Sequence, residues 1–176
     1  MADAAPALRL FFALWPDEAA RAGLLNLQRR LVQPPGARPV APENLHLTMA
    51  FLGMQPAALL PEIKAVLDRV TVPSMTLDID CYGCFARAGI AWAGMQRVPA
   101  ALLGLHQALM DALRECGIGH QTALAFRPHV TLFRRAECGS FALDEPVCWR
   151  APGLALVRSV TTARGAVYEV LAERGG

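Results

Sequence analysis

The chain has 176 residues, of which 54% are hydrophobic and 18% are charged. It can therefore bury a sizeable core, and its composition excludes an intrinsically disordered protein. The net charge is only +2. This argues against electrostatic binding of long nucleic acid over a large basic surface but allows a local basic cleft.

Hydrophobic periodicity and turn residues predict alternating strands and helices. In the first half we expect a strand over residues 9–15, a helix from Asp17 as N-cap to about residue 32, a strand over residues 45–52 and a helix over residues 60–70. In the second half we expect strands over residues 75–85 and 90–95, a helix from residue 100 to about 116, a strand that carries His129, and strands over residues 147–150, 154–162 and 166–171.

The two halves share an order of strand, proline-led helix, loop and strand, although their side chains are otherwise dissimilar. This repeat of architecture predicts an α+β fold, a bilobal pseudo-symmetric pair of antiparallel sheets flanked by helices around a central cleft. Neither half looks able to bury its faces alone. We therefore expect residues 1–176 to form a single domain made of two lobes.

The chain contains no apolar stretch that approaches the roughly 20 residues needed to cross a bilayer, and residues 10–15 lack the flanks of a signal peptide. We expect a cytoplasmic protein. The five cysteines are an odd number, which argues against a disulfide framework. Cys81 and Cys84 form a C-x-x-C pair, which we interpret as buried free thiols rather than as half of a zinc site or a redox pair.

An H-x-T triplet occurs twice, at residues 46–48 and 129–131, and both copies are predicted to lie in strands. Residues two apart in a strand share a face, so each histidine shares a face with its threonine. Leu47 and Val130, the central residues, then point to the core. A strand face that carries an imidazole and a hydroxyl loses burial energy unless it lines a cleft. The two triplets therefore predict one site with two imidazoles.

Two imidazoles, with unperturbed pKa values near 6.5, suit paired general acid–base catalysis at neutral pH. One neutral histidine takes a proton from the attacking oxygen, and the other, protonated, donates to the leaving oxygen. Threonine hydroxyls beside them can donate hydrogen bonds to oxygens that gain charge in the transition state. Phosphodiester cleavage needs this set of groups.

The rival interpretation of two histidines is a metal site, and catalytic zinc usually has three protein ligands. His106 lies in a predicted apolar helix, His120 lies in a loop, and the chain has no H-E-x-x-H or H-x-H spacing. We therefore expect no metal and no cofactor. Lys64, the only lysine, is in the middle of a predicted helix, which argues against ligation through a lysyl-adenylate.

The paired H-x-T triplets resemble those of the two-histidine phosphoesterase superfamily. Three blocks, at residues 9–17, 42–53 and 126–132, resemble the bacterial RNA 2′,3′-cyclic phosphodiesterases, also called 2′-5′ RNA ligases. The resemblance implies a bilobal fold with a central cleft and metal-independent hydrolysis of RNA 2′,3′-cyclic phosphate ends to 2′-phosphomonoesters. It also implies a possible reverse reaction, an ATP-independent 2′-5′ ligation.

Residue by residue, the resemblance implies that His46 and His129 are the catalytic pair and that Thr48 and Thr131 bind phosphate. As a hypothesis, His46 protonates the departing O3′ and His129 activates water. The pseudo-symmetry leaves the reverse assignment open.

Arg134 matches a basic residue that follows the second H-x-T-L in the family, where it would neutralise phosphate charge. Strand alternation puts Arg134 on the face opposite His129, so a bulge or strand end must turn it inward. Arg135 has the correct parity and is the competing candidate.

Further substrate contacts are expected from Arg127 at the cleft mouth and from aromatic side chains that can stack a base. The aromatic candidates are Phe51, Tyr82, Trp92 and Phe133, of which Phe133 has the best parity because it shares the strand face of His129.

The expected partner is an RNA with a 2′,3′-cyclic phosphate end, bound by a monomer without a membrane or a metal. One alternative is an enzyme of the same superfamily that acts on 2′-5′ oligonucleotides or small nucleotide cyclic phosphates. The other is a non-catalytic module that binds RNA or nucleotides. Two intact H-x-T triplets disfavour a simple binder, which arginine would serve better than imidazole.

Overall fold

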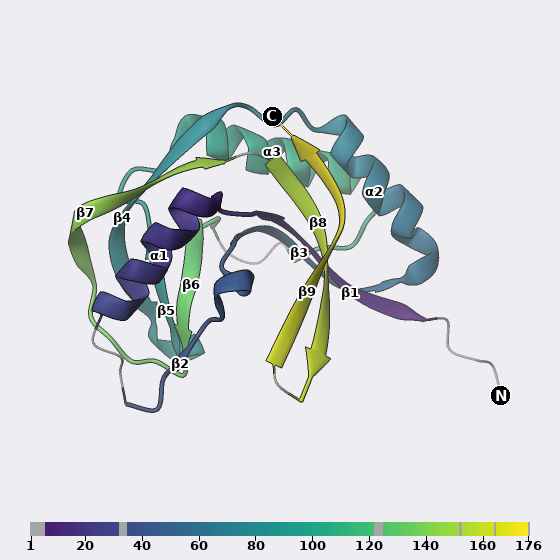
Figure 1. Ribbon diagram of the computed structural model, residues 1–176. Coiled ribbons are helices and arrows are strands. Elements are labelled where there is room, and N and C mark those ends of the chain that lie inside the picture. The colour runs from purple at the N-terminus through teal and green to yellow at the C-terminus, as the bar shows by residue number, and fades with distance from the viewer. Residues whose placement is uncertain (1–5, 32–34, 122–124, 152, 164, 176) are drawn as a thin grey trace.

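The strands of the computed structural model, which describes residues 6–31, 35–121, 125–151, 153–163 and 165–175, form one continuous nine-stranded sheet (Figure 1). Its two halves meet at the two H-x-T strands and are called the first and the second sheet below. The first sheet has the order β3-β1-β8-β9 and consists of β1 (Ala7–Leu14), β3 (Leu47–Pro56), β8 (Gly153–Thr162) and β9 (Gly165–Gly175). The second has the order β7-β4-β5-β6 and consists of β4 (Met75–Phe85), β5 (Ile90–Gly94), β6 (His129–Arg134) and β7 (Phe141–Ala151), with the short β2 (Arg38–Pro39) beside β6. A single residue pair, Leu47 with Val130, joins the two sheets. The predicted bilobal α+β architecture is confirmed.

The helices pack on the two sheets at places other than the Leu47–Val130 pair that joins them. α1 (Glu18–Arg30) follows β1 in the chain but packs on β7 of the other sheet, so it ties the two lobes together (Figure 1). Its N-terminus is capped as predicted, because the Asp17 carboxylate accepts a hydrogen bond from the Ala20 amide at 2.7 Å. α2 (Leu60–Arg69) and α3 (Ala100–Glu115) pack against each other and against the first sheet. No helix in the described part of the chain is long and apolar enough to span a membrane.

The predicted helices and strands are present, with differences at their ends. The end of the first helix near residue 32 falls outside the described residues, and α1 ends at Arg30. β7 begins at Phe141 rather than Val147, and β2 was not predicted. The first half of β7 is exposed and contains Pro146, so it carries no hydrophobic alternation. It is a strand because it pairs with β4 at the edge of the sheet, where a proline is tolerated.

β1 is buried on both of its faces. Phe12 and Leu14 are fully buried in the main core, which lies between the sheets and the helices. Phe11 and Ala13 point to the opposite face and form a second, smaller cluster with Ala155 and Val157 of β8, against which Trp15 and Tyr168 pack. Both faces of the strand are therefore apolar, and the second cluster lies on the side of the sheet that carries His46.

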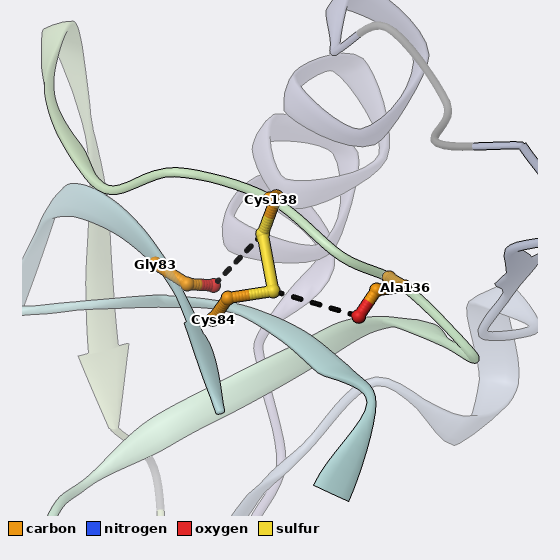
Figure 2. The surroundings of a disulfide bond; sticks show 4 residues. All are labelled: Gly83, Cys84, Ala136 and Cys138. Atoms are coloured by element: carbon orange, nitrogen blue, oxygen red, sulfur yellow. Dashed lines mark hydrogen bonds between the residues drawn. A yellow bond between two sulfur atoms is a disulfide. The ribbon is translucent and has the colours of Figure 1, made fainter. Parts of the chain in front are cut away.

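Cys84 and Cys138 form a disulfide (Figure 2). The prediction of free thiols at Cys81 and Cys84 is therefore wrong for Cys84, while Cys81 is free, as are Cys116 and Cys148. The bond joins the end of β4 to the segment that follows β6, across a sequence separation of 54 residues. Sequence spacing alone could not reveal it, because the pairing of β5 with both β4 and β6 is what brings the two cysteines together.

Candidate active site

The same local hydrogen bond orients both histidines of the H-x-T triplets. The Nδ1 atom of each ring donates to the carbonyl oxygen two residues earlier, Asn44 for His46 and Arg127 for His129, in both cases at 2.7 Å. This bond places the proton of the neutral ring on Nδ1 and leaves a lone pair on Nε2. At His46, the Thr48 hydroxyl lies 3.1 Å from Nε2 and donates to it. Nε2 is thus the atom of each ring that is free of the backbone bond and available for proton transfer.

The residue pair that joins the sheets also places the two H-x-T triplets opposite each other. Leu47 and Val130 are paired between antiparallel strands, so the histidine of each triplet stands opposite the threonine of the other. Leu47 and Val130 themselves are fully buried, as strand alternation requires. The structure therefore brings both H-x-T triplets to one place, on one face, at the joint between the lobes.

An aromatic environment surrounds His46. Its ring stacks on Trp15 with centroids 5.2 Å apart, lies 5.1 Å from Phe11, and meets Tyr168 edge-on at 5.2 Å. Burial lowers the pKa of His46 from 6.5 to about 4. The positive charges of Arg134 and His129 act in the same direction, and the hydrogen bond to Asn44 opposes it. His46 is therefore neutral at physiological pH in the free protein.

His129 lies in a more open aromatic environment on the other lobe. Its ring meets Phe85 edge-on at 4.9 Å, and Trp92 is 6.3 Å away. Burial lowers the pKa of His129 as well, against the hydrogen bond to the Arg127 carbonyl. Burial lowers the pKa of His46 more strongly than that of His129, so desolvation makes the two imidazoles unequal.

The burial of His46 predicts a loss of stability in acid. Because the pKa of His46 is about 4 when folded and 6.5 as the unperturbed value, the unfolded chain takes up the proton first as the pH falls. The free energy of unfolding should therefore decrease between these two pH values, by about 3 kcal/mol from this group, and level off below them. Urea denaturation at neutral pH and at about pH 4 measures this loss.

The control for this prediction is a matched pair of histidine variants. His46→Gln should lose less stability in acid than the wild type, because the group that titrates is gone. His120→Gln removes a histidine whose Nδ1 is bonded to Ile118 O at 2.9 Å, outside the joint between the lobes, and should keep the wild-type loss. Equal losses in the wild type and His46→Gln would contradict the assignment.

A β-bulge follows each H-x-T triplet. Met49 is an extra residue in β3 opposite β1, and Leu132 is an extra residue in β6 opposite β5. A bulge reverses the alternation of the residues beyond it. The residue three positions after each threonine therefore returns to the face of the triplet, and this residue is Phe51 in β3 and Arg134 in β6. Phe51 is 48% exposed, and Arg134 is exposed as well.

The bulge in β6 places the two arginines differently. It brings Arg134 to the face of His129, and the charge of Arg134 contributes to the low pKa of His46. Arg135 has a left-handed backbone with φ 56° just beyond the end of β6, where the chain turns away from the strand.

Phe133 and Tyr82 do not line the cleft. The prediction that Phe133 shares a face with His129 is wrong, because the bulge turns it into the core, where it is 2% exposed. Tyr82 is 3% exposed and packs on Phe141 at 4.9 Å. Both contribute to packing and are inaccessible to a substrate.

Trp92 lies flat against the second sheet beside His129. A Cβ atom at Gly83 would come within 2.5 Å of the indole, and one at Gly94 within 3.0 Å, so both glycines make room for the ring. Arg127 is exposed, and its backbone carbonyl orients His129.

Sequence reasoning missed four aromatic residues around the histidines: Phe11, Trp15, Phe85 and Tyr168. Only β1 carries a signal that could have found any of them. Its unbroken apolar run is typical of a strand buried on both faces, which places Phe11 in a second apolar layer. Phe85 and Tyr168 reach the histidines through strand pairing between distant segments, which local pattern does not encode.

The two remaining histidines have other contacts. His106 stacks on Phe126 with centroids 3.8 Å apart, and His120 bonds to Ile118. Among the residues that the structure describes, no group of three or more histidine, cysteine, aspartate or glutamate side chains is arranged to hold a metal ion.

Comparison with known proteins places this site in a family. A family model described as LigT like Phosphoesterase matches residues 14–92. The chain is 34% identical to the RNA 2′,3′-cyclic phosphodiesterase of Escherichia coli (strain K12) over 129 residues, which cover 73% of each protein. It is 32% identical to the RNA 2′,3′-cyclic phosphodiesterase of Thermus thermophilus over 180 residues, which cover 93% of this chain and 88% of that protein.

Solved structures agree with these sequence matches. A crystal structure of a phosphoesterase superposes with a TM-score of 0.88 at 28% identity, and E. coli LigT complexed with 3′-AMP superposes with a TM-score of 0.86 at 29% identity. Each comparison covers 97% of this chain and 98% of the other. Because relatives more than 30% identical cover most of its length, the chain belongs to the LigT-like phosphoesterases, the family of the RNA 2′,3′-cyclic phosphodiesterases.

Proposed function

We propose that this chain hydrolyses RNA 2′,3′-cyclic phosphate ends to 2′-phosphomonoesters by two-histidine general acid–base catalysis. The observation that carries the proposal is the joint between the sheets, which sets two H-x-T triplets on one face with the Nε2 atom of each ring free of the backbone. The names of the relatives supply the substrate class.

The residues at the joint have different roles in the proposed reaction. One neutral imidazole takes a proton from water as the water attacks phosphorus, and the bond to O3′ breaks as the other imidazole, protonated, donates to it. Thr131 donates a hydrogen bond to a non-bridging oxygen, and so does Thr48 once its hydroxyl turns from His46 Nε2 to the substrate. Arg134 balances the charge of these oxygens.

The unequal burial of the histidines supports one assignment of roles. A base must be neutral before the reaction, and His46, with a pKa of about 4, meets that condition throughout the neutral range. We assign His46 as the base and His129 as the acid, the reverse of the order hypothesised from the sequence. The negative charge of a bound phosphate favours the protonated form that His129 needs.

Phe51 extends the site beyond the phosphate. Nearly half of its side chain is exposed, on the same side as Phe11, whose ring centroid is 6.2 Å away. A base of the substrate can stack on such a ring, a contact worth about 1–3 kcal/mol in single-strand binders. Arg127, which is exposed and lies two residues before His129, offers a positive charge for the RNA backbone.

Ligation would be the reverse of the same chemistry, with a 5′-hydroxyl attacking the cyclic phosphate in place of water. It needs no adenylate and therefore no lysine nucleophile, in keeping with Lys64 lying on α2 as the only lysine of the chain. We also propose that the enzyme is cytoplasmic and acts as a monomer of one domain, in which the packing of α1 on β7 joins the two lobes.

Hydrolysis of an oligonucleotide that ends in a 2′,3′-cyclic phosphate tests the function. The purified protein should form the 2′-phosphomonoester in excess EDTA at its full rate. The pH dependence of kcat/KM should be bell-shaped, with its rising limb near pH 4 from His46 and its falling limb below pH 6.5 from His129. Formation of a 3′-phosphate, or loss of activity in EDTA, would contradict the proposal. A 2′-5′ dinucleotide and a nucleoside 2′,3′-cyclic phosphate, assayed alongside, show whether another substrate is preferred.

A further inference from the structure

The disulfide between Cys84 and Cys138 lies close to the His129 side of the proposed site. Cys84 ends β4 directly before Phe85, whose ring contacts His129. Cys138 follows Arg134 by four residues in the segment that leaves β6 (Figure 2). The Cα atoms are 5.7 Å apart, within the usual range for a disulfide.

The structure provides partners for the two sulfur atoms in the reduced state as well. Cys84 Sγ lies 3.7 Å from the Ala136 carbonyl oxygen, and Cys138 Sγ lies 3.7 Å from the Gly83 carbonyl oxygen (Figure 2). If the bond opens, each thiol can donate to the oxygen it already touches. Reduction therefore leaves neither thiol without an acceptor, and the surrounding backbone suits both redox states.

Both cysteines are partly exposed, and a cavity opens beside one of them. It has a volume of about 420 Å³ and lies between α1 and the beginning of β7, with walls formed by apolar residues, among them Leu27, Leu31 and Phe141, and by the charged residues Arg30, Asp144 and Glu145. Cys138 lines this cavity, whereas Cys84 does not. An external thiol can therefore approach the disulfide from the side of Cys138.

We infer that Cys84 and Cys138 form a reversible thiol–disulfide exchange site for a low-molecular-mass thiol, and that the state of the bond tunes how tightly the cleft holds phosphate. The thiolate of the external thiol attacks Cys138 Sγ, the bond to Cys84 breaks, and the released Cys84 thiolate takes a proton from water. A second external thiolate attacks the external sulfur of this mixed disulfide and releases Cys138. Two external thiols are oxidised to one disulfide, and the protein disulfide is reduced to two thiols.

The link to the cleft, which rests on the proposed function, runs through the segment between Arg134 and Cys138. This segment is otherwise held by the pairing of Arg134 with Ile90 and by the bond from the Ala136 amide to the Gly89 carbonyl at 3.0 Å. Opening the disulfide removes the covalent tie from this segment and from the strand end that carries Phe85. Reduction should therefore raise KM for the cyclic phosphate by about 2- to 30-fold, the usual range for indirect coupling, with a smaller effect on kcat.

Alkylation of cysteines across a series of ratios of reduced to oxidised glutathione tests the exchange site. Mass spectrometry should show Cys84 and Cys138 becoming alkylated together in one two-electron transition. Cys148→Ser, which removes an exposed free cysteine, should leave the transition unchanged. Alkylation of the pair at every ratio, or at none, would overturn the exchange site. This measurement needs no substrate, so its result stands even if the chain does not hydrolyse cyclic phosphates.

Two single variants test the route through the cavity. With oxidised glutathione, Cys84→Ser should form a mixed disulfide at Cys138, and Cys138→Ser should form far less at Cys84. Equal labelling of both would overturn the role of the cavity. The coupling to the site is then measured as KM for oxidised and reduced wild-type protein. Equal KM values, with the redox transition present, would overturn the coupling.

Discussion

Replacing His46 or His129 with alanine is expected to lower kcat for the cyclic phosphate by about 10²- to 10⁴-fold in each case, the usual contribution of a general acid or base. The Nε2 atoms of both rings lie at the joint between the lobes. Each H-x-T triplet thus provides one histidine for one of the two proton transfers. The double variant should be little worse than the poorer single variant, because the two groups act in one step. Single-turnover kinetics measure the chemical step directly.

His106→Ala is the matched control for these variants. It removes a histidine that stacks on Phe126 in another part of the fold, and it should retain the wild-type kcat. Circular dichroism at neutral pH should show that all three variants are folded. Retention of more than about a tenth of the activity by His46→Ala or His129→Ala would contradict a general acid–base role for that residue.

The same variants separate the acid from the base. In a substrate with sulfur in place of the bridging O3′, the leaving thiolate needs no proton. With His46 as base and His129 as acid, activity should return to His129→Ala, while His46→Ala stays inactive. Recovery of His46→Ala alone would instead support the order hypothesised from the sequence. Recovery of both, or of neither, would remove the distinction.

Arg134→Gln is expected to reduce kcat/KM by about 10- to 100-fold, because a charge-assisted hydrogen bond to phosphate is worth about 1.5–3 kcal/mol. The bulge in β6 places Arg134 on the face of the H-x-T triplet, and its charge acts on His46. Loss of that charge should also raise the pKa of His46, which can be followed by NMR titration.

Arg135→Gln removes the same charge one residue further along, at a position whose left-handed backbone is equally unsuited to arginine and glutamine. It should change kcat/KM by less than about threefold, as expected for an exposed charge outside the site. A larger effect from Arg135→Gln than from Arg134→Gln would show that the parity argument from the sequence was correct and that the bulge does not act as inferred.

Much of the fold follows from local patterns in the sequence. β4 was predicted at its observed ends, and α2 and α3 within one residue, because strand alternation, helix periodicity and proline or glycine signals act over a few neighbouring residues. The edge strand β7 was predicted only in its buried second half. Its exposed half takes its conformation from β4, so its own residues carry little signal.

The sequence by itself determined the chemistry: two H-x-T triplets, each with an inward-pointing central residue, in an α+β chain of two similar halves. Period-two alternation is sufficient for that, because it relates residues only two apart. Tertiary structure decided the rest. The bulge after Thr131 exchanged Phe133 for Arg134 on the face of His129, and the pairing of β4, β5 and β6 brought Cys84 to Cys138. The aromatic contacts that lower the pKa of His46 come from β1, the residue that follows it, and β9. Each of these depends on contacts between residues far apart in the chain, which local periodicity cannot express.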